Sequence, residues 1–148
     1  MIWTLKIECV WGMHLQEECI RLIEIDSGSS LLELHEAIQD AVDFDGDHLF
    51  EFFVGRNWRN RKVVFDDAID WDESFETYSN ITLDQVYPLE KSLKLYYHFD
   101  FGDDWHFEIR KGRRSPQKPE AGVTYPRLVE AIGPNPPQYG IYEEDEEE

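Results

Sequence analysis

Four side chains that could bind a metal ion or transfer protons lie within one short segment of this 148-residue chain. Apolar and polar residues alternate on both sides of Gly102-Asp103-Asp104, which predicts a β-hairpin with a three-residue loop. Both strands must present their apolar side chains to one core, so this loop places Asp100 opposite His106. It likewise places His98 opposite Glu108. The two acids and two imidazoles would then share the polar face of the hairpin.

This arrangement has a functional and a structural interpretation. The four side chains could bind a divalent metal ion or act as acid–base pairs, which would make the protein a metal-dependent, hydrolase-like enzyme. They could equally be cross-strand ion pairs on a solvated sheet face, which contribute little to stability. The chain contains no CxxC, HExxH, GxGxxG or GxSxG sequence. Two histidines on neighbouring strands can share an ion, but their spacing is not a strong zinc signature. We therefore favour ion pairing and a non-enzymatic role, with no cofactor unless a divalent metal ion binds here.

Two turns supply candidate contacts for a partner. The tip of the predicted hairpin contributes Asp103, Asp104 and Trp105, and an earlier turn contributes Arg56, Trp58, Arg59 and Arg61. Eight of the 14 Lys and Arg residues lie in two stretches, 56–62 and 110–114. With Trp as a stacking surface, these stretches could contact phosphates or a single strand, as in a nucleic-acid accessory factor for transposition or recombination. The structural alternative is two solvated hairpin ends that balance an acidic body.

The composition indicates a folded, acidic protein. Hydrophobic residues make up 41% of the chain and aromatic residues 14%, which is unlike a disordered protein. The formal charge of −18 disfavours broad nonspecific binding to nucleic acid or anionic membranes. The length predicts one domain over residues 1–140, followed by a disordered acidic tail over 141–148. Because no basic leader or long apolar run is present, we expect a cytoplasmic protein with a protein partner and no membrane association.

Local patterns predict the elements that position these residues. Alternation favours strands over residues 2–10 and 19–25, which would form a hairpin. Ser30 and Glu33 form a capping box that predicts the start of a helix. Further strands are predicted over 48–54 and 62–65, followed by an irregular segment over 66–80 that Ile69, Trp71 and Phe75 anchor. A short helix is predicted after Thr82, and another over 126–132 that ends at Gly133. This order predicts an α+β protein with a mixed β-sheet, a second β-hairpin and short extra helices.

Several segments resemble a known family in order and spacing. Residues 97–105 resemble the Tyr-x-Tyr-Asp-Phe-Gly-Asp-x-Trp core of the plasmid pRiA4b ORF-3-like family, and residues 34–41 are similar to its Leu-His-x-x-Ile-Gln-x-Ala helix. Residues 125–126 and 136–137 resemble its later Tyr-Pro and Pro-Pro elements. The resemblance spans residues 3–140. It implies a β-grasp-like hairpin–helix–strand core and an association with plasmids or transposable elements, but no established activity.

The chain departs from the family pattern at two places that could carry chemistry. Phe107 stands two residues after the Trp, where the family usually has His, and the histidine here is residue 106. Gln138 and Tyr139 replace the Glu-Asp that follows the two prolines. A family site that used those groups would be altered in this chain. The leading hypothesis is therefore a non-enzymatic protein-interaction module associated with a mobile element.

Overall fold

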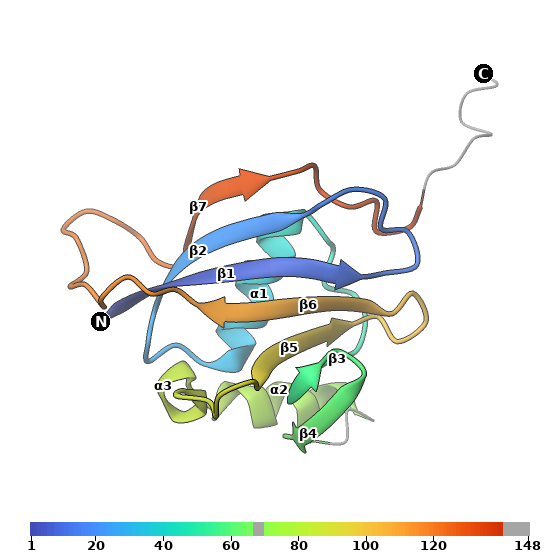
Figure 1. Ribbon diagram of the computed structural model, residues 1–148, viewed down its shortest axis with the longest axis horizontal. Coiled ribbons are helices and arrows are strands. Elements are labelled where there is room, and N and C mark those ends of the chain that lie inside the picture. The colour runs from blue at the N-terminus through green and yellow to red at the C-terminus, as the bar shows by residue number, and fades with distance from the viewer. Residues whose placement is uncertain (67–69, 141–148) are drawn as a thin grey trace.

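The computed structural model describes residues 1–66 and 70–140, which form one β-sheet and three helices (Figure 1). The strands are β1 (Ile2–Trp11), β2 (Ile20–Asp26), β3 (Phe50–Asn57), β4 (Asn60–Val64), β5 (Lys94–Phe99), β6 (Trp105–Lys111) and β7 (Arg127–Ile132). The helices are α1 (Leu31–Val42), α2 (Trp71–Ser79) and α3 (Leu83–Val86). Within these described ranges, no helix is long and apolar enough to cross a membrane. The predicted acidic tail lies outside the described residues.

The sheet confirms the α+β class and corrects its finer description. The strand order is β4-β3-β5-β6-β1-β2-β7, and every strand pairing in the described part of the chain is antiparallel. The expected mixed sheet is therefore wrong. The predicted hairpin, helix and strand do follow one another in β1, β2, α1 and β3. The β-grasp-like arrangement is not confirmed, because β1 lies between β2 and β6 and runs antiparallel to both.

Helix α1 covers one face of the sheet because one side of the helix is apolar (Figure 1). Its predicted capping box is confirmed. The Ser30 hydroxyl accepts the Glu33 N–H at 3.1 Å, and the Glu33 carboxylate accepts the Ser30 N–H at 2.9 Å. The core between α1 and the sheet is rich in fully buried aromatic side chains, among them Phe50, Phe52, Tyr97, Phe99, Trp105 and Phe107. With this face filled by the core, polar side chains of the same strands lie on the opposite face.

The β5–β6 hairpin has the predicted faces but not the predicted register. His98 pairs with His106, so the loop spans residues 100–104 and contains five residues instead of three. The expected pairing of Asp100 with His106 is therefore wrong, as is that of His98 with Glu108. The two histidines face each other across the strands.

The longer loop forms because Asp100 leaves the strand and organises a turn. Its φ of 60° lies in the left-handed region, which an aspartate tolerates better than most residues. Its carboxylate accepts the N–H groups of Gly102 and Asp103, each at 3.2 Å. Its carbonyl accepts the N–H of Asp104 at 2.5 Å. Both three and five are odd loop lengths, so the alternation of apolar and polar residues is kept in either register.

Strand β7 occupies the place of the helix predicted over 126–132. It pairs with β2, with Ile132 beside Ile20, and the Arg127 guanidinium lies 2.7 Å from the Glu24 carboxylate. The open edge of β2 offers backbone partners to the whole segment. That tertiary pairing outweighs the local Pro and Gly pattern, which is typical of helix ends.

Helix α2 lies within the segment predicted to be irregular. Asp70 caps it by accepting two backbone N–H groups of the first turn, at 2.8 and 3.1 Å. Tyr78 is fully buried, and its hydroxyl accepts the Phe52 N–H at 2.9 Å. The helix is therefore held by a cap and a buried anchor. Ile69, which was expected to anchor this segment, lies outside the described residues.

Candidate functional site

Three paired strands place Glu51, His98 and His106 in one row across the sheet. Glu51 of β3 pairs with His98 of β5, which pairs in turn with His106 of β6. Neighbouring residues such as Phe52 and Tyr97 point into the core, so the row lies on the opposite face. The three side chains are nevertheless buried. Another part of the chain must therefore cover this face.

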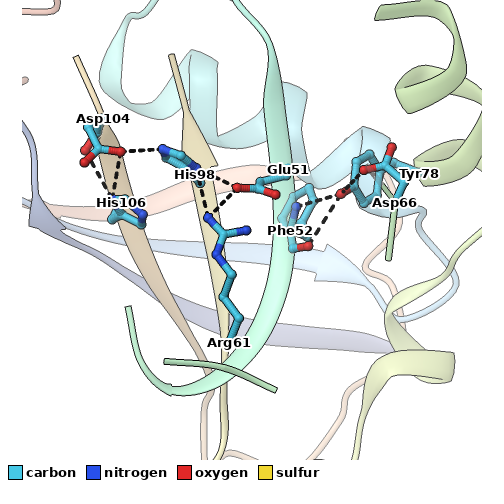
Figure 2. A network of polar contacts seen from close by, with 8 residues as sticks. All are labelled: Glu51, Phe52, Arg61, Asp66, Tyr78, His98, Asp104 and His106. Atoms are coloured by element: carbon cyan, nitrogen blue, oxygen red, sulfur yellow. Dashed lines mark hydrogen bonds and ion pairs between the residues drawn. The ribbon is translucent and has the colours of Figure 1, made fainter. Parts of the chain in front are cut away.

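The β3–β4 hairpin supplies that cover. The pairing of β3 with β4 shifts register on both sides of Gly55, and the hairpin bends there. The ring of Trp58, in the turn, lies 4.8 Å from the ring of His106. Arg61 Nη2 lies 2.6 Å from Glu51 Oε2, and Figure 2 shows the arginine extending toward the row of strands. The turn and the sheet face thus form one packed unit.

Five rings form a continuous row of contacts through this unit, which we call the stack; the rings are tilted from Trp11 to His106 and closer to parallel from His106 to Phe101. The ring centroids are 5.7 Å apart for Trp11 and Trp58, and 4.8 Å apart for Trp58 and His106. The two imidazoles lie 4.1 Å apart with an interplanar angle of 11°, and His98 lies 4.6 Å from Phe101. The end members Trp11 and Phe101 are 37% and 39% exposed. The stack joins the end of β1, the β3–β4 turn and the β5–β6 loop.

Glu51 is the electrostatic centre of the buried row. Its Oε2 lies 2.7 Å from His98 Nδ1 and 2.6 Å from Arg61 Nη2 (Figure 2). Burial alone raises the pKa of Glu51, but the hydrogen bonds from His98 and Arg61 outweigh burial and lower the pKa to about 2. Glu51 is therefore a carboxylate at neutral pH, and it holds the β3–β4 hairpin to β5.

Asp104 closes the other side of the row. Its Oδ1 lies 2.6 Å from His98 Nε2, and its backbone oxygen lies 3.1 Å from His106 Nδ1. Burial, followed by the neighbouring His98, lowers the pKa of His106 to about 4, so this imidazole is neutral at pH 7. His98, Asp104 and His106 offer three ligand atoms that all lie within 4.8 Å of one another. These three residues are where a metal ion could be held.

Two of the four residues predicted for a metal site lie outside this cluster. Asp100 caps the loop, and its carboxylate lies 3.6 Å from His48. Glu108 lies 3.5 Å from Lys94 and 2.6 Å from Arg110. The structure brings together only the two histidines of the predicted set, and Asp104 takes the place of the predicted acids.

The predicted partner contacts divide between the surface and the interior. Trp105 is fully buried in the core, so it is not part of the exposed surface. Asp103 is partly exposed at the tip of the β5–β6 loop. The Arg59 guanidinium is exposed and lies 4.8 Å above the Trp58 ring. The Arg61 side chain is 36% exposed, and its guanidinium is paired with Glu51. We define the ring-stack surface as the exposed and partly exposed residues Trp11, Met13, Trp58, Arg59, Phe101 and Asp103.

The two basic stretches meet at the other end of β5. Two grooves, of about 580 and 560 Å³, adjoin each other because both are lined by Pro88, Leu89 and Leu93. The first groove is also lined by Lys94, Arg110 and Lys111, and the second by Arg56, Lys62 and Lys91. We call them the basic grooves. Arg56 thus lines a groove, whereas Arg61, which pairs with the adjacent Gly55, contacts Glu51 on the sheet face.

Three residues of the site were not predicted from the sequence. Glu51 comes from a strand whose partner is 47 residues away in the chain, and no local pattern indicates that pairing. Phe101 was expected on the apolar face of the hairpin, but the longer loop places it on His98. Trp11 ends a strand that was expected to stop one residue earlier. Knowledge of the strand order would have been needed to find Glu51, and knowledge of the loop length to find Phe101.

Two known proteins are similar to this chain, one described as uncharacterised and the other as of unknown function. An uncharacterised protein of Sinorhizobium fredii, y4hQ, is 28% identical over 126 residues, which are 84% of this chain and 60% of the relative. The chain thus spans about 60% of the length of that curated relative. A solved structure, the protein of unknown function MM3350 from Methanosarcina mazei Go1, has the same fold, with 23% identity and a TM-score of 0.63 over 88% of this chain and 68% of that chain.

The family model described as plasmid pRiA4b ORF-3-like protein matches residues 4–140. This match covers nearly all the described residues, including the β5–β6 hairpin on which the resemblance was first noted. It confirms the family inferred from the sequence. The chain belongs to the plasmid pRiA4b ORF-3-like family.

Proposed function

We propose that residues 1–140 form one domain that acts as a non-enzymatic protein-interaction module and binds its partner through the ring-stack surface. The observation that carries this proposal is the stack of five rings with an exposed aromatic side chain at each end. Trp, Met and Arg are enriched in protein interfaces and their energetic hot spots. The ring-stack surface combines all three types within one patch.

Rigidity of this patch supports the same proposal. Trp58 and Phe101 pack on buried imidazoles, and Met13 donates its N–H to the Asp103 carbonyl at 2.9 Å. Side chains that are ordered before binding lose less entropy when a partner docks. The charge of −18 favours a partner with a basic surface, because opposite charges speed the encounter. The plasmid in the family description supports an association with a mobile element, inside the cytoplasm.

Substitutions on the ring-stack surface should remove partner binding without unfolding the protein. We expect affinity purification of the full chain to recover a protein that is lost in the double variant Arg59→Glu, Phe101→Ala. The reason is loss of the charged contact beside Trp58 and of the exposed aromatic ring at one end of the stack. The matched control is Arg56→Glu, which changes the same charge on the same hairpin but in a basic groove. Equal recovery by the parent chain and the double variant would contradict this surface assignment.

A nucleic-acid accessory function is the second candidate, and the basic grooves favour it. Six basic residues from distant parts of the chain line two adjoining grooves. Arg110 and Lys94 already pair with Glu108. The remaining cations, among them Arg56 and Lys62, would neutralise phosphates and release counterions from the nucleic acid.

Salt dependence tests this second candidate. If the basic grooves bind single-stranded DNA, the affinity should fall steeply as the salt concentration rises. The double variant Arg56→Glu, Lys62→Glu should reduce both the affinity and the slope of log affinity against log salt concentration. Arg59→Glu is the matched control, because that side chain lies on Trp58 outside the grooves. Fluorescence anisotropy at several salt concentrations measures both quantities. Binding that is the same in the groove variant and the control variant would exclude the grooves.

A further inference from the structure

His98 is placed where a single proton cannot satisfy both of its ring nitrogens. Its Nδ1 lies 2.7 Å from Glu51 Oε2, and its Nε2 lies 2.6 Å from Asp104 Oδ1. A neutral imidazole has one N–H, so it can donate to only one of these carboxylates. The lone pair of the other nitrogen would then face a carboxylate oxygen. A cation between His98 Nε2 and Asp104, either a proton or a metal ion, removes that conflict.

His106 completes a ligand set at the same point. It faces His98 across β5 and β6, and an imidazole can offer the lone pair of one ring nitrogen to a metal ion. One ligand atom from each of His98, Asp104 and His106 lies within 4.8 Å of the other two. We propose that these three residues form a binding site for a divalent transition-metal ion of the zinc class. Two imidazoles and one carboxylate are a ligand set that suits such ions.

The surroundings of His98 match those of metal-binding histidines. In such sites the second ring nitrogen of a ligating histidine usually donates to a carboxylate, which orients the ring. Glu51 holds His98 Nδ1 in this way, and Arg61 holds Glu51 through the 2.6 Å ion pair. Glu51 and Arg61 are therefore positioning residues for the proposed site. They orient the His98 lone pair toward Asp104.

Binding would draw the three ligands closer together and turn at least one imidazole, because the in-plane lone pairs of two rings that stack 4.1 Å apart at 11° do not converge on one ion. Metal–ligand bonds of about 2 Å require ligand atoms that are nearer to one another than the present limit. The Asp104 side chain is 38% exposed on the loop, so it can move toward the two strand-bound histidines. Three protein ligands leave the fourth position of a tetrahedral ion to water, so the metal-loaded form is the one in which to test the hydrolase-like alternative.

Calorimetric titration of the full chain with Zn²⁺ alone, after removal of metal by a chelator, tests the proposal. We expect one ion per chain, and at least about tenfold weaker binding in Asp104→Asn and in His106→Gln. The Asp104→Asn variant keeps the size of a partly exposed side chain and is expected to fold, which a thermal melt checks. His48→Gln is the matched control, because His48 lies beside Asp100 outside the cluster.

The outcomes separate this site from the interaction surface. Loss of binding in Asp104→Asn, with binding retained in His48→Gln, supports the site. No zinc uptake by the parent chain overturns it, and so does uptake that is unchanged in Asp104→Asn or lost equally in His48→Gln. Because the probe is the metal alone, none of these results depends on whether the ring-stack surface binds a partner.

Discussion

Replacement of Gly55 by alanine should lower the free energy of unfolding by about 3 kcal/mol, in the range expected for an overpacked, close-packed position. A Cβ atom at residue 55 would lie 1.9 Å from the Asn60 carbonyl oxygen and 2.9 Å from its carbonyl carbon. Both are backbone atoms, so no side-chain rotation relieves the clash. The β3–β4 hairpin must open, which moves Trp58 away from His106. Urea unfolding measures the loss, and near-ultraviolet circular dichroism reports the change around Trp58.

Gly102→Ala is the matched control for this prediction. A Cβ atom there would meet only the Asp100 carboxylate, at 3.5 Å, which is an ordinary contact. We expect its stability to stay within about 0.5 kcal/mol of the parent. If Gly55→Ala unfolds at the same urea concentration as Gly102→Ala, the hairpin is not held down on the sheet as described.

Acid should destabilise the protein through His35, a buried histidine of α1. Tyr97 OH lies 2.5 Å from His35 Nδ1, and Gln39 donates to the same hydroxyl at 2.9 Å. The hydroxyl proton is therefore available to His35 Nδ1, which accepts it as a neutral ring. Burial lowers the pKa of His35 from 6.5 to about 4. Between these two values the unfolded chain binds the additional proton, so stability falls as the pH drops below about 6.5.

The expected loss attributable to His35 is about 2 kcal/mol between pH 7 and pH 5. It is fully developed only below the folded-state pKa of about 4. The His35→Gln variant keeps an acceptor for the Tyr97 hydroxyl but does not titrate. Between pH 7 and pH 5, its free energy of unfolding should therefore fall by about 2 kcal/mol less than that of the parent protein. Urea unfolding of both proteins at the two pH values gives the comparison. Equal pH dependence in the two proteins would show that His35 does not bind its proton preferentially in the unfolded state.

The sequence correctly predicted the elements that are determined by residues close together in the chain. The Ser30–Glu33 capping box lies within one turn of helix, and α1 begins where that box predicts. The apolar alternation in β5 and β6 correctly assigns Tyr97 and Phe107 to the core. It specifies only that the loop length is odd, however, so it cannot distinguish a loop of three residues from one of five.

Non-local pairing explains what the sequence did not reveal. The two-residue shift of the hairpin replaces two acid–imidazole pairs by one His98–His106 pair. The acids that contact these histidines then come from elsewhere, namely Glu51 of β3 and Asp104 of the loop. Strand β7 also depends on a distant partner, because β2 precedes it by about a hundred residues. The Glu51 contact and the pairing of β7 depend on strand order, which local propensity does not specify. The register shift and the Asp104 contact depend on the length of the β5–β6 loop.

Site-specific photo-crosslinking in cells that express the full chain tests the proposed interaction surface most directly. A benzophenone-bearing phenylalanine at residue 101 keeps an aromatic ring beside His98 and reports which molecules touch the exposed end of the stack. The same probe at Val64, which is 50% exposed on β4, is the control. We predict a protein adduct at residue 101 that is absent at residue 64 and is lost with Arg59→Glu. No adduct at residue 101, or the same adducts at both positions, would contradict the account.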